Sequence, residues 1–156
     1  MNKKEEGFTL IEVVVVVAMI ALISAFSVPK VRGYLAKGKD AKAIVLLNRL
    51  RMASEMYYTE EGKALGGDNP GSVSSEDIKK LLKYLDVNAE KSFCEDGKTV
   101  EIGGTTVDTK IVYGGTIGFT FLAPTGSTQD SDGVYIWFEP QSENEKCSSG
   151  KNWNEY

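Results

Sequence analysis

The chain has 156 residues, of which 42% are hydrophobic and 26% charged, so it has room for one modest hydrophobic core. It contains no histidine, which excludes Ser-His-Asp and Cys-His catalysis and zinc sites built on imidazole; we expect no enzyme activity. Residues 1–42 carry a formal charge of +3 and residues 43–156 one of −7, which together give the net charge of −4. We therefore predict no binding of nucleic acid through phosphate contacts.

An apolar segment lies near the amino terminus, at residues 8–28. Its sequence, FTLIEVVVVVAMIALISAFSV, contains one charged residue and neither glycine nor proline. As a helix it would be about 30 Å long, which is enough to cross the hydrocarbon core of a membrane. The segment has two simple interpretations: it is a secretory signal that is cleaved after Ser27, or it is an uncleaved signal anchor. However, the segment is longer than the roughly 7 to 15 residues of a signal-peptide core, and it contains a carboxylate.

The carboxylate is Glu12, and its position needs a physical explanation. A charged side chain inside a membrane segment costs on the order of 3 kcal/mol, and somewhat less one turn from the end, where it can reach toward water. If the chain is cut between Gly7 and Phe8, a free amino group appears four residues before Glu12. That amine on a neighbouring copy would pair with the carboxylate in only one axial register. Glu12 is therefore predicted to set the register of an assembly.

The hexapeptide GFTLIE at residues 7–12, with a short charged leader before it and the apolar segment after it, resembles the class III signal of type IV prepilins and type II secretion pseudopilins. The resemblance implies that residues 1–7 are a leader, that prepilin peptidase cuts after Gly7, and that Phe8 becomes the N-methylated new terminus. It also implies that Glu12 acts in assembly, and that Pro29 is the helix-kinking proline common in the family.

Helical spacing of apolar residues continues beyond the membrane segment and predicts an amphipathic helix over residues 29–61. Pro29, Gly33 and Gly38 are weak points in this helix, because proline removes a hydrogen bond and glycine costs about 1 kcal/mol relative to alanine. They mark either a simple kink or, as the resemblance implies, a segment that extends when a fibre is packed or stretched.

The remaining residues, 62–156, are predicted to form a globular head. A loop rich in Gly, Asn, Asp, Pro and Ser is followed by a helix that Ser74 or Ser75 can cap. The spacing of apolar residues then changes to that of strands, which we expect at residues 99–102, 107–113, 118–122 and 134–138. The fold class is thus α+β, pilin-like, with a long amino-terminal helix packed on a small antiparallel sheet.

Two further features of the head could carry a covalent bond or a metal. Cys94 and Cys147 are too far apart for a CxxC motif, and in an exported chain we expect them to form a disulfide that closes the carboxy-terminal region, as in many pilins. Asp130 and Asp132 alternate before a glycine, a spacing that can present oxygen atoms to calcium. An acidic turn before the next strand explains the same residues without a metal, so no cofactor is required.

These features together predict a structural subunit of a type IV pilus-like filament. Its partners would be other copies of itself, minor pilins, prepilin peptidase, the membrane assembly platform and, before assembly, membrane lipid. The precursor would cross the cytoplasmic (inner) membrane once with its head outside the cytoplasm, and then join an extracellular pilus. Two alternatives stay open: a pseudopilin of a type II secretion system, in a periplasm-spanning fibre, and a membrane-anchored extracytoplasmic binding domain.

Overall fold

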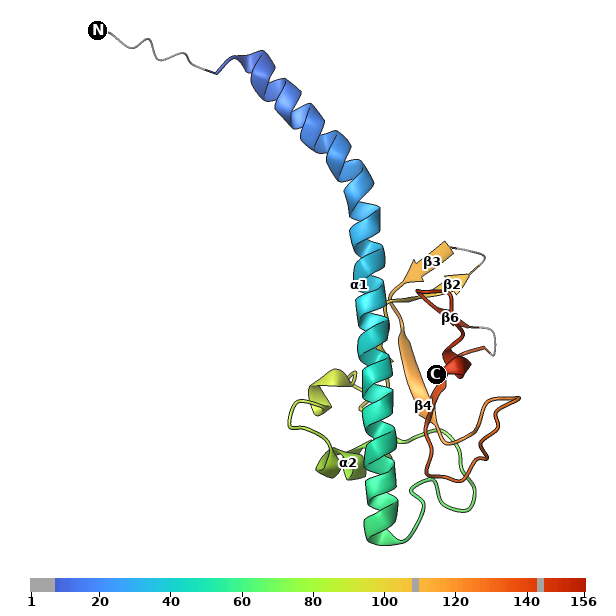
Figure 1. The fold of residues 1–156 in the computed structure, drawn as a ribbon. Helices are drawn as coiled ribbons and strands as arrows, with labels where there is room; N and C mark the ends of the chain where they lie inside the picture. Colours follow the sequence, from blue (N-terminus) through green and yellow to red (C-terminus); the bar gives the residue numbers. More distant parts are fainter. Residues whose placement is uncertain (1–7, 108–109, 143–144) are drawn as a thin grey trace. The chain divides into compact units, whose positions relative to one another are not determined.

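The computed structural model describes residues 8–107, 110–142 and 145–156 (Figure 1). The chain divides into two compact units, the first ending at Tyr34 and the second beginning at Leu35. The division falls inside α1 (Leu10–Glu61), a helix of 52 residues. The prediction that the helix runs to Glu61 is confirmed.

In the first unit, α1 presents apolar side chains on every side and buries none of them within the chain. Pro29 lies inside the helix and does not end it. This is the one helix, among the described residues, that is long and apolar enough to cross a membrane. The all-round apolar surface is typical of a helix surrounded by lipid or by other helices.

In the second unit, α1 is amphipathic and buries one face against the head. The buried positions recur three or four residues apart, which is the spacing of one side of a helix. They are Ala36, Asp40, Ala43, Leu46, Leu47, Leu50, Ala53 and Ser54.

The short helix α2 (Ser75–Leu81) begins where the sequence predicts. The Ser74 hydroxyl accepts a hydrogen bond from the Asp77 backbone N–H, and the Asp77 carboxylate accepts one from the Ser74 backbone N–H. This reciprocal capping box satisfies two backbone donors that the first helical turn would otherwise leave unpaired. Ile78 and Leu81 then enter the hydrophobic core. Two 3₁₀ turns follow, η1 (Leu82–Tyr84) and η2 (Glu90–Ser92).

The head contains two three-stranded antiparallel sheets where the sequence analysis expects one. The first has the order β1-β4-β5, and its strands are β1 (Val100–Glu101), β4 (Thr116–Thr120) and β5 (Trp137–Glu139). The second has the order β3-β2-β6, with strands β2 (Gly104–Val107), β3 (Lys110–Tyr113) and β6 (Lys146–Cys147). The chain ends in a 3₁₀ turn, η3 (Trp153–Glu155).

The prediction of one strand at residues 107–113 is wrong: Val107 is the last residue of β2, and Lys110–Tyr113 form β3, which pairs with it. Residues 108 and 109 lie outside the described residues. β2 and β3 form an antiparallel ladder in which Gly104 lies opposite Tyr113 and Val107 lies opposite Lys110. The prediction failed because no glycine or proline interrupts this stretch of sequence, so it reads as one continuous strand. The sequence did not predict β6. This strand has only two residues, too few for a detectable alternation of apolar and polar side chains.

The core of the head lies between α1, α2 and the strands. In the view of Figure 1, α2 and the strands lie on either side of the lower part of α1. Leu47 and Leu50 of α1 belong to the same buried cluster as Phe119, Phe138 and Trp153. Phe138 stacks on Phe119 at 5.6 Å between ring centroids and meets Trp153 edge-on at 4.8 Å. The fold class predicted from the sequence, a long helix packed on antiparallel strands, is confirmed.

Candidate functional site

The amino-terminal end of α1 is the site that the sequence motif singles out. Gly7, the residue expected before the cut, lies outside the described residues together with the rest of the leader. Phe8 is described, and 78% of its surface is exposed. Helix α1 begins two residues later, at Leu10.

Glu12 and Thr9 form a capping box at this helix end. The Glu12 carboxylate oxygen Oε2 accepts hydrogen bonds from the Thr9 backbone N–H at 2.8 Å and from the Thr9 hydroxyl at 2.7 Å. In return, the Glu12 N–H donates to Thr9 Oγ1 at 3.4 Å. Local bonds of this kind lower the cost of placing the carboxylate in an apolar environment. Among the described residues Oε1 accepts no hydrogen bond, so one oxygen of Glu12 is available to a cation from outside the chain.

The apolar residues that follow Glu12 make a continuous exposed surface. From Leu10 to Val28 every residue of α1 is exposed. Removing apolar surface from water is favourable by a free energy of about 25 cal/mol for each Å². A helix with this much exposed apolar surface is therefore stable only in lipid or packed against other helices. The arrangement can therefore anchor the chain and supply an assembly interface.

A buried carboxylate that the sequence analysis missed fixes α1 to the strands of the second unit. Asp40 is 3% exposed. Its Oδ1 accepts the Gly103 N–H at 2.7 Å, and its Oδ2 accepts the Ser148 N–H at 2.8 Å and the Ser148 hydroxyl. Three donors thus satisfy the buried charge. The signal was present in the sequence, because Asp40 lies four residues after Ala36 and three before Ala43, on the buried face of the helix.

Gly103 explains how the carboxylate reaches the strands. A Cβ atom at this position would lie 1.9 Å from the Ala36 carbonyl oxygen, so only glycine allows the chain to approach the helix this closely. The close approach brings the Gly103 N–H within reach of Asp40.

The expected disulfide between Cys94 and Cys147 is absent from the structure, where both residues are free thiols. Cys94 is bonded through its N–H to the Thr99 carbonyl, beside β1, whereas Cys147 lies in β6 and pairs with Thr105 of β2. Cys147 therefore belongs to the second sheet, whereas Cys94 lies outside the strands, in the segment between η2 and β1. The Cys147 sulfur instead lies 2.8 Å from the Ser149 hydroxyl. Burial raises the pKa of this thiol, but hydrogen bonds from Ser149, Tyr156 and the nearby backbone outweigh it, so its pKa lies below the ordinary value.

Asp130 and Asp132, the residues considered for calcium, lie in a turn. Asp132 Oδ1 accepts the backbone N–H groups of Val134 and Tyr135 at 2.9 and 2.8 Å, which makes it the acceptor of a turn before β5. Asp130 lies in the same turn, and its carbonyl oxygen accepts the Asp132 N–H. Within the part of the chain that the structure describes, no group of three or more His, Cys, Asp or Glu side chains is placed to hold a metal ion.

The amino-terminal segment and much of the rest of the chain are similar to known proteins. Residues 2–28 match a family model described as the prokaryotic N-terminal methylation motif. A type IV major fimbrial protein of Dichelobacter nodosus is 34% identical over 123 residues, which cover 71% of this chain and 75% of that protein. A type IV major pilin protein of Neisseria gonorrhoeae is 33% identical over 90 residues, and a fimbrial protein of Neisseria meningitidis is 33% identical over 89.

The two Neisseria alignments each cover 56% of this chain and only about half of the relative, 54% and 52%. No solved structure gives a significant match.

Proposed function

Because this chain belongs to the type IV pilin family, we propose that it is a filament subunit that is cut after Gly7, N-methylated on Phe8 and polymerised through α1. The observation that carries the proposal is the exposed apolar surface of α1 from Leu10 to Val28, with Glu12 as its one charged side chain. No other part of the described chain offers an interface of comparable length and apolarity.

The same surface would serve in two environments in turn. In the precursor, α1 would lie in the cytoplasmic (inner) membrane, where lipid covers its apolar side chains. In the filament, the equivalent helices of other copies would replace the lipid, so that the apolar surface stays out of water throughout. The heads, which bury their own cores, would coat the outside.

Glu12 would select the register in which copies pack. After cleavage, the Phe8 amine of one copy would reach the free Oε1 of Glu12 in the next, while Thr9 continues to bond Oε2. A helix packed in another register would leave the amine and the carboxylate unpaired in an apolar environment, which costs several kcal/mol. Hydrophobic contact would thus supply affinity, and the ion pair would supply the register.

The proposed partners follow from these steps. They are prepilin peptidase for the cut, a membrane assembly platform for extraction, and other copies of the chain together with minor pilins in the filament. The mature chain would end in an extracellular pilus. A secretion pseudopilin would share the same amino-terminal chemistry, so the location of the fibre separates the two functions.

The test is the intact mass and amino-terminal sequence of the protein recovered from fibres sheared off the cell surface. We expect a chain that begins with N-methylated Phe8. Fibres that stay in the envelope and never reach the surface would favour the secretion function instead. A chain that begins at Met1 or Val28 would refute the proposal.

A further inference from the structure

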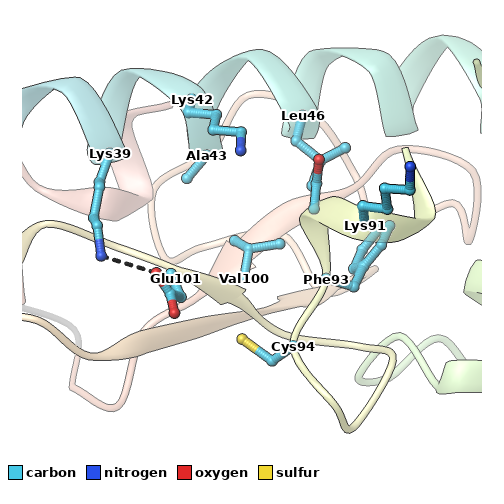
Figure 2. Close-up of a pocket in the computed structure, with 10 residues that line it drawn as sticks. Lys39, Lys42, Ala43, Leu46, Lys91, Phe93, Cys94, Val100 and Glu101 are labelled. Atoms are coloured by element: carbon cyan, nitrogen blue, oxygen red, sulfur yellow. Dashed lines mark hydrogen bonds and ion pairs between the residues drawn. The ribbon is translucent and has the colours of Figure 1, made fainter. Parts of the chain in front are cut away.

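A pocket of about 290 Å³ opens between α1 and the segment that joins η2 to β1 (Figure 2). Its floor is apolar and is formed by Ala43 and Leu46 of α1 and by Val100 of β1, all buried, with Phe93 beside them. The pocket lies entirely within the second unit.

Three lysines surround this apolar floor. Lys39 donates to Glu101 at 2.8 Å, so its charge is paired within the head. That hydrogen bond, followed by the charges of Lys39 and Lys42, holds the pKa of Glu101 below its ordinary value. Lys42 and Lys91 have no carboxylate within ion-pair distance among the described residues. The pocket therefore suits a guest that combines negative charge with an apolar side chain.

The last turns of α1 have this composition. Glu55 and Glu61 are exposed and have no cation within ion-pair distance in the described chain. Glu60, which lies beside them, is bonded by Lys83 and Tyr84. Met56 and Tyr58 are 53% and 49% exposed, so apolar surface alternates with the carboxylates. We call residues 55–61 the acidic end of α1.

A chain cannot place its own acidic end in its own pocket. Lys42 and Glu61 are 19 residues apart on one helix, which is about 28 Å at 1.5 Å per residue. Two parallel copies displaced by about that distance along the helix axis bring the acidic end of one to the pocket of the other. The register proposed for Glu12 involves a much smaller displacement, because four residues of helix span about 6 Å. A helical filament contains neighbours at several axial distances, so it can hold both contacts.

We infer that this pocket receives the acidic end of α1 from a second copy of the chain. The inference rests on the proposed function, because it needs copies that lie parallel and displaced along one axis. An exposed ion pair contributes only about 0 to 1 kcal/mol. In a filament, however, the same ion pair is repeated in every copy. A neighbour in the wrong register would bring like charges together, and this repulsion selects the partner and the register.

Carbodiimide cross-linking of sheared filaments tests the contact directly, because it joins an amine to a carboxylate only where they touch. We expect cross-links from Lys42 or Lys91 to Glu55 or Glu61. The 28 Å separation of Lys42 and Glu61 within one chain means that a cross-link between these two residues joins two copies. Lysines that cross-link only to carboxylates of their own head, such as Glu101, would overturn the inference and leave the filament itself intact.

Charge reversal gives an independent test. Lys42→Glu with Lys91→Glu should lower filament yield at least tenfold, and so should Glu55→Lys with Glu61→Lys. All four changes in one chain should restore the yield, because each contact is again between opposite charges. Lys79→Glu with Lys110→Glu changes the net charge equally at exposed lysines outside the pocket and should leave the yield unchanged.

The melting temperature of each detergent-solubilised variant verifies that the head is folded. Wild-type yield from the Lys42, Lys91 pair would overturn the inference. Absence of filaments from the wild-type chain in a strain with the pilus assembly proteins would overturn the proposed function as well.

Discussion

The two stretches of α1 differ in what they bury. Between Leu10 and Tyr34 the helix places no side chain in the interior of the chain, whereas between Leu35 and Glu61 it buries eight. Val14 and Leu47 illustrate the contrast, since the first is 56% exposed and the second is fully buried. One continuous helix thus has a stretch that is exposed on all sides and a stretch that is packed on one side against its own chain.

The difference follows from the residues on each side of the helix. From Leu10 to Val28 the first stretch is apolar on every side except at Glu12, so no face of it is suited to water. The second has lysines and glutamates on its exposed face, and its buried face consists of small or apolar residues together with Asp40, so it packs on the head and is solvated elsewhere. The first stretch is therefore adapted to other molecules, lipid or further copies, and the second to its own chain.

The largest effect is expected from Glu12→Ala. The change removes the one charged group from the exposed apolar surface but leaves its area nearly intact, so the protein should stay in the membrane with a folded head. Filaments should be lost, because the change removes the carboxylate that we propose selects the register. Electron microscopy of the sheared fraction and membrane fractionation measure the two outcomes.

Ser24→Ala is the matched control, a polar residue of the same stretch with no proposed partner. It should assemble normally. Normal filaments from Glu12→Ala would remove the role of the carboxylate in assembly.

Asp40→Ala should strongly destabilise the second unit. It leaves the Gly103 and Ser148 N–H groups buried without an acceptor, which should lower the free energy of unfolding by on the order of 3 kcal/mol. Urea unfolding of the detergent-solubilised chain, followed by the fluorescence of the buried Trp153, measures the change. Equal stability of Asp40→Ala and the exposed control Asp68→Ala would show that the buried carboxylate does not hold the strands to the helix.

Leu47→Ala and Met52→Ala compare the two faces of α1 within the second unit. Leu47 is fully buried, and its truncation should cost about 2 to 5 kcal/mol. Met52 is 64% exposed, and its truncation should change the free energy of unfolding by about 0.5 kcal/mol or less. The same unfolding measurement applies. Similar losses from the two variants would contradict the one-sided packing of this stretch.

The smallest effect is a pH dependence at the acidic end of α1. A hydrogen bond from the Tyr84 hydroxyl at 2.7 Å, and then one from Lys83 at 3.0 Å, hold the pKa of Glu60 below its ordinary value. A carboxyl whose pKa is lower in the folded state stabilises that state above its unfolded pKa, and the contribution disappears as the pH falls through the folded pKa.

The melting temperature of Glu60→Gln should therefore lie slightly below that of the wild type at pH 6, and the difference should become smaller as the pH is lowered toward 3. Glu61 has no such hydrogen-bond partners, so Glu61→Gln should have the same melting temperature as the wild type at every pH. A difference that persists unchanged to pH 3 would contradict this account of Glu60.

Those parts of the fold that local sequence determines could be predicted. The helix end at Glu61 follows from the loss of apolar spacing at Gly62, and the start of α2 follows from the Ser74 and Asp77 pair. Both signals lie within a few residues of the feature that they mark.

Features that depend on distant parts of the chain could not be predicted. The carboxylate of Asp40 is explained only by partners 63 and 108 residues away. The place of Cys147 in the second sheet likewise depends on its pairing with Thr105 of β2, which spacing along the chain does not reveal. Even at the motif, the sequence identified Glu12 but not that Thr9 binds one of its oxygens.

The most direct test of the central claim is the structure of the assembled filament by cryo-electron microscopy. We predict that α1 from Leu10 to Val28 lies in the filament core against other copies, with the Phe8 amine of one copy within hydrogen-bonding distance of Glu12 in the next. A filament held together by its heads, with this stretch of α1 outside the core or the amine far from any Glu12, would contradict the account.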